Sequence, residues 1–182
     1  MKKLFAFALI AGLLISCTST PDPAAAEAEK AKVEAKAKAD EHVAVVEKYL
    51  SAFETGDFES WRGICTEDFL TYGPQYDGEG TLDEYIGSMN SFEEVSDSLK
   101  SRTIAILAHS VDEGDMHGDY VFWWGINSMY FIEAEKHVKL MIHTVFKMKE
   151  GKIEWETDYW DTGDLKSQLS GDKESKKKAE KE

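Results

Sequence analysis

Two residues near the end of the chain, His143 and Asp158, are of types that could carry acid–base chemistry. They lie in two β-rich segments, 137–148 and 153–161, which the turn Glu150-Gly151 joins. If that turn has two residues, His143 lies directly opposite Asp158, where Cβ atoms are about 5 Å apart. A histidine beside a partly desolvated carboxylate can act as a general acid–base pair. The pattern therefore predicts a pair that could abstract a proton next to a carbonyl group.

The same register predicts an apolar surrounding for this pair. Met141, Val145 and Trp160 would share its face of the hairpin and exclude water from the carboxylate. Tyr72 and Trp123, on earlier segments, are two further candidates for a pocket wall, or ordinary core residues. Three interpretations of the pair stay open: a catalytic pair, the polar end of a binding pocket, or two side chains that only satisfy each other.

Other motifs add no chemistry to this picture. The acidic turn 112–119 contains groups that can bind metals, but it lacks a recognised ligand spacing. The sequence contains no phosphate-binding glycine loop, no Ser–His–Asp order and no zinc pattern. We therefore expect neither a metal nor a cofactor.

The elements that must position these residues predict an α+β domain. Apolar residues at helical spacing from Val43 to Phe53 indicate a first helix, and Thr81-Leu82-Asp83-Glu84 has the capping-box spacing of another. From Thr103 onward, strands are expected at 103–111, 119–132, 137–148 and 153–161. Helices followed by a meander of strands favour helices packed on one face of an antiparallel sheet.

The N-terminus indicates export and a lipid anchor. Lys2 and Lys3 precede an apolar run of about a dozen residues, too short to span a bilayer, which is typical of a secretory signal. The segment Leu14-Ile15-Ser16-Cys17 resembles the bacterial lipobox, in which cleavage precedes a lipidated cysteine. We therefore expect a signal peptide at 1–16 and lipidation of Cys17, which would tether the protein to a membrane of the cell envelope. Thr18, where inner-membrane lipoproteins of enteric bacteria have Asp, favours the outer membrane facing the periplasm.

The remaining chain divides by composition. Residues 17–41, rich in Ala, Glu and Lys, predict a helical spacer, and the charged segment 172–182 predicts a disordered tail. The domain between them, 42–171, contains 25 acidic and 10 basic residues. Such a negative field repels phosphate backbones, so we expect no nucleic-acid partner.

Three strings, in this order and spacing, resemble one superfamily. They are 53–58 (FETGDF), 68–74 (DFLTYGP) with the turn and helix at 78–85, and 151–168, which contains Tyr159-Trp160-Asp161. Together they resemble the nuclear transport factor 2-like superfamily, and within it the SnoaL-like polyketide cyclases. The resemblance implies a cone-shaped curved sheet with N-terminal helices on its concave face, an apolar pocket, and a homodimer.

The resemblance also implies roles for the two candidate residues. SnoaL-like cyclases use an Asp of the last strand as acid–base group, with a His on the preceding strand, and Asp158 and His143 occupy those places. The chain departs from related patterns at three positions. Gly73 stands where ketosteroid isomerases have their base, and Glu156 and Thr157 stand where the cyclases commonly have His and Trp.

These observations favour an envelope lipoprotein whose SnoaL-like domain binds a small apolar or amphipathic ligand. An acid–base enzyme of the cyclase, isomerase or dehydratase type is one alternative. A protein-interaction or dimerisation module without a ligand is the other.

Overall fold

The computed structural model describes residues 23–74 and 78–171. The expected signal peptide, Cys17 and the tail 172–182 lie outside these residues. The chain divides into two compact units, one up to Glu34 and one from Ala35 onward, and the second contains the sheet. No helix in the described ranges is long and apolar enough to span a membrane.

The second unit is built on a six-stranded sheet with the order β2-β1-β6-β5-β4-β3. Its strands are β1 (Cys65–Tyr72), β2 (Glu79–Thr81), β3 (Ser96–Val111), β4 (Gly118–Phe131), β5 (Lys136–Lys149) and β6 (Lys152–Trp160). All neighbours pair antiparallel except β1 and β6, which run parallel. The sheet is therefore mixed, which corrects the expected purely antiparallel sheet. The parallel pair arises because β1 precedes the meander in sequence but joins its last strand.

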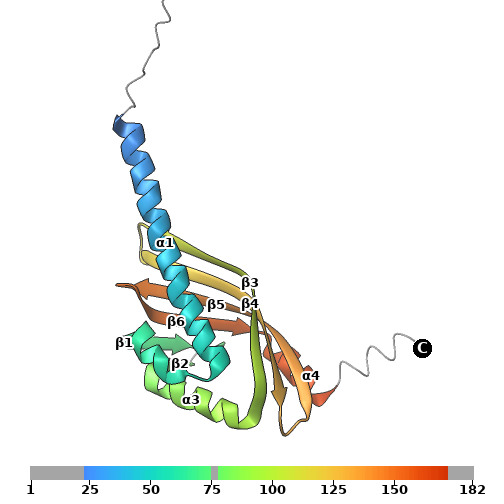
Figure 1. The fold of residues 1–182 in the computed structure, drawn as a ribbon. Helices are drawn as coiled ribbons and strands as arrows, with labels where there is room; N and C mark the ends of the chain where they lie inside the picture. Colours follow the sequence, from blue (N-terminus) through green and yellow to red (C-terminus); the bar gives the residue numbers. More distant parts are fainter. Residues whose placement is uncertain (1–22, 75–77, 172–182) are drawn as a thin grey trace, which may run out of the picture. The chain divides into compact units, whose positions relative to one another are not determined.

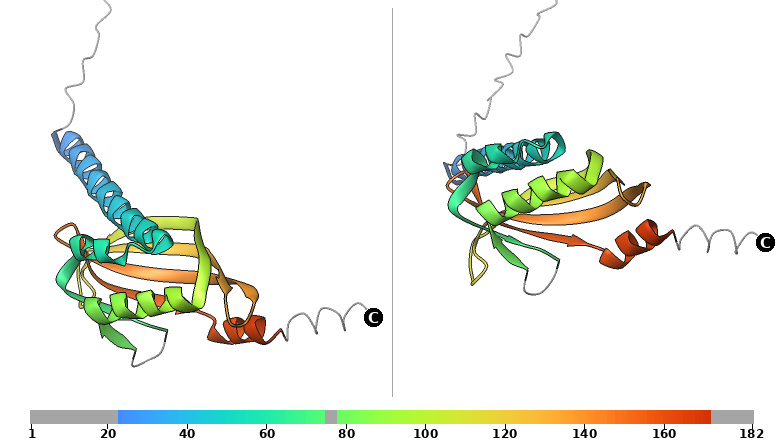
Figure 2. Two further views of the ribbon diagram at one scale, coloured as in Figure 1. Left: turned by 60° about the horizontal axis from the view of Figure 1, so that its bottom comes forward. Right: turned by 90° about the horizontal axis from the view of Figure 1, so that it is seen from below.

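Helices cover one face of this curved sheet, as Figures 1 and 2 show. Helix α1 (Pro23–Thr55) is followed by the short η1 (Phe58–Ser60) and α2 (Trp61–Ile64), and then by α3 (Leu82–Val95) between β2 and β3. Helix α4 (Thr162–Ser170) follows β6 and packs beside β5. The α+β class with helices on the concave face is thus confirmed. The helix α1 runs without a break through the expected boundary between spacer and domain at 41/42.

Aromatic stacking joins the helices of the concave face. The ring of Tyr49 on α1 stacks on Trp61 at a centroid distance of 4.5 Å, and Trp61 stacks on Tyr85 of α3 at 5.2 Å. The Trp61 Nε1–H donates to the Tyr49 carbonyl oxygen over 3.1 Å. Because buried aromatic pairs stabilise beyond their buried area, this stack holds α1 and α3 in a defined relation.

The start of α3 is fixed by the capping box that the sequence indicates. The Thr81 side chain accepts from the Glu84 backbone N–H, and the Glu84 carboxylate accepts from the Thr81 N–H over 2.8 Å. These two bonds satisfy N–H groups that a helix leaves without internal partners. The capping box thereby fixes the residue at which α3 begins.

The hairpin of β5 and β6 departs from the expected register. Lys149 pairs with Lys152 and Met148 with Ile153, but Lys147 pairs with Trp155, so that Glu154 is an extra residue in a β-bulge. Beyond the bulge every pair is shifted by one residue, and Thr144, rather than His143, lies opposite Asp158. Because a shift of one residue exchanges the two faces of a strand, the bulge decides which side chains face the helices.

Candidate ligand pocket with a buried carboxyl pair

A cavity of about 330 Å³ lies between the helices and the concave face of the sheet. Its wall is mainly apolar, with side chains from α1, α3, β4, β5, β6 and α4, among them Phe53, Tyr85, Trp123, Phe146 and Trp160. Its polar side chains include Glu156 and Asp158, which lie two residues apart on β6 and share its inner face. A mainly apolar cavity with a few grouped polar atoms is the usual form of a small-molecule site.

Glu156 is the most deeply buried acidic side chain of this site, with 1% of its surface exposed. Its Oε2 accepts a hydrogen bond from the Tyr49 hydroxyl over 2.8 Å, and its Oε1 accepts from Thr71 over 3.1 Å. Burial and the charge of Asp158 raise the pKa of Glu156 to about 8. This carboxyl group is therefore predominantly protonated at neutral pH.

Asp158 is the second carboxyl group, and it borders the cavity directly. Its Oδ1 accepts from the Thr144 hydroxyl over 2.5 Å. Burial raises the pKa of Asp158 to about 6, although the Thr144 hydrogen bond and the charge of His143 favour the ionised form. The pair thus combines a neutral acid with a carboxylate near pH 7, and the two titrate together.

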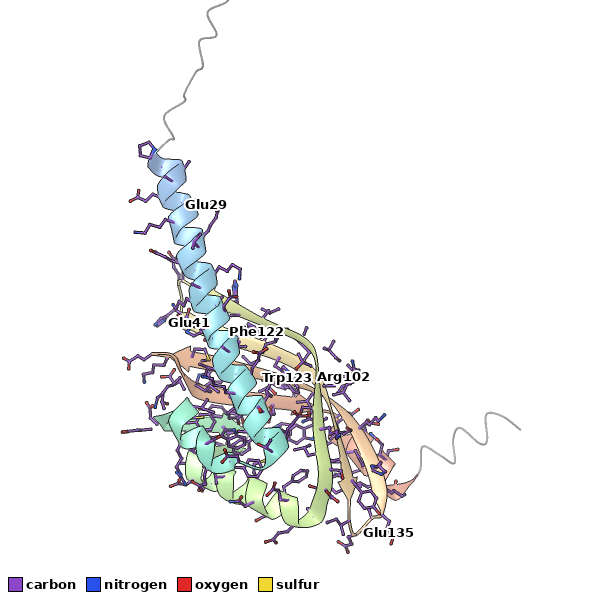
Figure 3. The ribbon with its side chains drawn as sticks, viewed as in Figure 1. Glu29, Glu41, Arg102, Phe122, Trp123 and Glu135 are labelled. Atoms are coloured by element: carbon purple, nitrogen blue, oxygen red, sulfur yellow. The ribbon has the colours of Figure 1, made fainter. Side chains whose placement is uncertain are left out.

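Of the seven residues predicted for the site, three line this cavity: Asp158, Trp160 and Trp123. The indole N–H of Trp123 donates to Thr103 on β3 over 2.9 Å, which fixes the ring against the inner face. Trp123 lies on the inner face of β4 next to Phe122 on the outer face, and Figure 3 labels both residues. Their roles in binding stay predictions.

The other four predicted residues lie on the outer face of the sheet, which corrects the expected placement. His143 is not opposite Asp158; its ring stacks on Trp124 at 4.5 Å, and its Nδ1 lies 3.0 Å from the Trp123 carbonyl oxygen. Met141 and Val145 alternate with Ile142 and Thr144 and share the face of His143. Tyr72 packs edge-on against Trp155 at 6.2 Å. For the three residues of β5, the physical reason is the bulge at Glu154, which shifts the register of β6 by one residue and removes His143 from the predicted pair.

Sequence reasoning missed Glu156, Tyr49, Tyr85 and Thr71. The signal for Glu156 was present, because residues two apart on a strand share a face in any register, so Glu156 accompanies Asp158 wherever it points. Tyr49 and Thr71 had no local signal, since they meet Glu156 only through contacts between segments far apart in sequence. The described residues contain no group of three or more side chains placed to hold a metal ion.

Solved structures with the same arrangement come from several kinds of protein. A LEH-like epoxide hydrolase of Mycobacterium tuberculosis is 18% identical with a TM-score of 0.56, and the match covers 74% of this chain and 93% of that one. A putative polyketide cyclase of Streptomyces antibioticus, IdmH, is 14% identical with a TM-score of 0.56, covering 71% and 98%.

A third structure is a hypothetical protein of Catenulispora acidiphila with a ketosteroid isomerase-like fold, in complex with trimethylamine. It is 12% identical with a TM-score of 0.57, and the match covers 69% of this chain and 92% of that one. No protein-family model matches the sequence, and no curated protein is significantly similar to it. The matches cover 92–98% of these three chains, and at identities of 12–18% they show a common fold and no shared activity.

Proposed function

We propose, from the premise that this chain has the nuclear transport factor 2-like fold, that its domain binds a small, largely apolar ligand in the internal cavity. The observation that carries the proposal is a cavity of about 330 Å³ with apolar walls and one group of polar side chains at Glu156 and Asp158. The apolar walls favour the body of the ligand, and the carboxyl pair orients its polar group.

The cavity can be tested with a neutral apolar probe, 1-adamantanol, titrated calorimetrically into the purified full-length protein. Ser88 on α3 is exposed and also borders the cavity, so Ser88→Trp should block entry and weaken binding. Ser91 is exposed on the same helix but does not line the cavity, so Ser91→Trp is the matched control. Equal binding by Ser88→Trp and Ser91→Trp would contradict the proposal.

The second part of the proposal is that the domain is held at a membrane by a lipid on Cys17. The support is the basic and apolar N-terminus followed by the lipobox-like segment 14–17. A lipid anchor would keep the pocket at the membrane surface of the envelope, where apolar compounds accumulate. Cys17→Ser should release the protein from the membrane fraction in cell fractionation, and retention of that variant would contradict the anchor.

A second candidate function, acid–base catalysis, is favoured by the unequal protonation of the two carboxyl groups. Asp158, ionised near neutral pH, could accept a proton from a carbon next to a carbonyl group. The neutral Glu156 carboxyl or the Tyr85 hydroxyl could then stabilise the negative charge on the carbonyl oxygen, and the proton would return to carbon. His143 has no part in this scheme, because it lies on the other face.

Proton abstraction can be measured with cyclohexanone in D₂O by the exchange of its α-protons in NMR spectra. The protein should accelerate exchange above the buffer rate, and Asp158→Asn should return the rate to that background. Exchange that persists in Asp158→Asn would exclude Asp158 as the base. Binding of 1-adamantanol without any exchange would leave the protein as a binder.

A further inference from the structure

The charge of the cavity wall restricts the ligands that it can hold. Among the described residues that line the cavity, two carry a carboxyl group, Glu156 and Asp158. None of these lining residues is Lys, Arg or His. A ligand carboxylate or phosphate would meet the Asp158 charge in a poorly hydrated space without a cation to compensate it. Anionic ligands are therefore disfavoured.

The Asp158 carboxylate lacks the partners that a desolvated anion needs. Its Oδ1 accepts one hydrogen bond from Thr144, and no donor of the described residues bonds to Oδ2. No cationic side chain forms an ion pair with it in the described ranges, and the nearby His143 lies on the opposite face of the sheet. An ammonium group in the cavity would supply both the missing charge and additional N–H donors.

The groups that face the pair from the surrounding elements leave it with a single negative charge at neutral pH. Tyr49 of α1, Tyr85 of α3 and Thr71 of β1 are neutral hydroxyl groups around Glu156. Tyr49 and Thr71 donate hydrogen bonds to Glu156, whose carboxyl group is predominantly protonated at neutral pH. One negative charge, that of Asp158, thus remains without an opposite charge. A ligand with one positive charge would neutralise it.

The walls of the cavity also suit a cation. Tyr85, Trp123 and Trp160 belong to the lining, and aromatic ring faces attract organic cations through their negative electrostatic potential. The remaining lining is aliphatic or phenyl, including Leu50, Met89, Met129, Leu140 and Ile142, and would surround an apolar body. The cavity thus combines a place for a positive charge with a larger apolar space.

We infer that the ligand is a small organic monocation, an amine whose protonated ammonium group meets Asp158 and whose compact apolar body fills the cavity. This inference rests on the proposed binding function and specifies its ligand class. A neutral compound of the same shape would lose the ion pair, and an anionic compound would be repelled.

Three probes of equal shape test the ligand class: 1-adamantylamine, 1-adamantanol and 1-adamantanecarboxylate, each titrated calorimetrically into the full-length protein at neutral pH. A charged hydrogen bond to a desolvated carboxylate should make the amine bind about tenfold or more tightly than the alcohol. The carboxylate should bind more weakly than the alcohol. Equal affinity for amine and alcohol would overturn the cation preference and leave the pocket intact, whereas no binding by any probe would overturn the binding function itself.

The pH dependence gives a second test that needs no variant. Because the pKa of Asp158 is about 6, amine affinity should fall about tenfold from about pH 7 to about pH 5, as the carboxylate takes up a proton. The alcohol carries no charge, so its affinity should not show this fall between about pH 7 and about pH 5. An amine affinity that does not change with pH would contradict the ion pair with Asp158.

Asp158→Asn keeps the size of the side chain and removes its charge, so the amine should lose its advantage over the alcohol. Glu94→Gln removes one charge from the exposed side of α3, away from the cavity, and should keep the full advantage. Thermal unfolding of both variants checks that they fold. A folded Asp158→Asn protein that still prefers the amine would overturn the inference.

Discussion

The Glu156 carboxyl group lies in the interior of the protein with hydroxyl donors from two other elements and no cation. Its Tyr49 and Thr71 partners satisfy both oxygens, which reduces the cost of removing the group from water. They do not supply an opposite charge, so the group keeps its proton to a pH where exposed carboxyl groups have lost theirs.

This protonation makes the stability of the fold depend on pH. In the unfolded chain Glu156 loses its proton near its ordinary pKa of 4.5, whereas in the folded protein it keeps the proton up to about pH 8. Between these values the unfolded state is favoured by proton release, so stability falls as the pH rises, by about 1.4 kcal/mol per pH unit for this group. Glu156→Gln cannot release this proton, and the slope of its unfolding free energy between pH 6.5 and 8 should be smaller than that of the unaltered protein.

Chemical denaturation at several pH values measures this difference. Glu94→Gln, whose side chain is exposed on α3, is the control and should keep the slope of the unaltered protein. Parallel slopes for Glu156→Gln and the unaltered protein would show that Glu156 ionises near its ordinary pKa in the fold.

The sequence predicts which residues of this site share a face of one strand, because side chains alternate between the two faces of a strand. It does not predict which residues of other elements they meet. Asp158 and Trp160, two residues apart on one strand, were expected on a common face, and both border the cavity. The partner of Asp158 on the next strand depends on the register, and there the prediction of His143 was wrong. Tyr49 lies 107 positions from Glu156 in the sequence, a separation at which neither spacing nor periodicity carries information.

Among the elements, the β5–β6 hairpin shows why a register could not be derived from its turn alone. The turn pairs Lys149 with Lys152 as expected, so the assumption about the turn was correct. The bulge follows at Glu154, whose carboxylate contacts Lys149 over 2.9 Å and Lys147 over 3.2 Å. A regular hairpin would place Glu156 and Asp158 beside His143 on the outer face and leave the cavity without them. In the observed, irregular register, the apolar residues Phe146, Met148 and Ile153 lie on one face and are buried.

The strand β4 requires glycine at position 125. Gly125 follows Trp123 on the inner face, and a Cβ atom at this position would overlap the Trp123 indole ring. Because Trp123 lines the cavity and bonds Thr103, Gly125→Ala should displace the ring and cost about 1–3 kcal/mol of unfolding free energy.

Gly63 in α2 is the matched control, since a Cβ atom built there has no atom within 4 Å apart from those of its chain neighbours and its own helix backbone. Gly63→Ala should leave stability unchanged or raise it by about 0.5–1 kcal/mol, as alanine favours a helix. Thermal unfolding and 1-adamantanol affinity measure both effects. Equal stability and equal 1-adamantanol affinity of the two variants would show that residue 125 can carry a Cβ atom beside Trp123 without loss.

At the scale of the whole molecule, the class and order of elements were predictable because the apolar patterns of the strands and of the first helix are local. The parallel pairing of β1 with β6, the short strand β2 and the mixed sheet were not, because they depend on which distant segments meet. The resemblance to nuclear transport factor 2-like proteins supplied the concave sheet that periodicity alone could not give.

The outer face of the sheet is apolar and aromatic in its middle. Met141 and Tyr159 are 70% and 54% exposed, and Phe122, Trp124 and His143 form a continuous stack beside them. Basic side chains on the same face, Lys100, Arg102 and Lys139, contrast with the net charge of −14 of the whole chain. An exposed apolar face of this kind is typical of an interaction surface.

We expect the homodimer implied by the resemblance to form through this outer face. Because like charges would then approach one another, dimerisation should strengthen as salt screens them. Sedimentation of the full-length protein at low and high salt measures this effect. Met141→Ser should weaken the dimer, and Val33→Ser, at an exposed position in the unit up to Glu34, should not. A single-chain mass at every protein concentration would contradict the dimer.

The parallel pairing of β1 with β6 has a consequence for the order of folding. β1 and β2 are attached to the rest of the sheet through β6, the last strand to be synthesised, and the hydroxyl and carboxyl groups of the pocket meet only when that strand is in place. Contacts over such long loops form late, because closing them costs chain entropy before any contact compensates it. We therefore expect a nascent chain that ends before Lys152 to form the three-stranded meander without the pocket, because the strand that carries Glu156 and Asp158 is still missing.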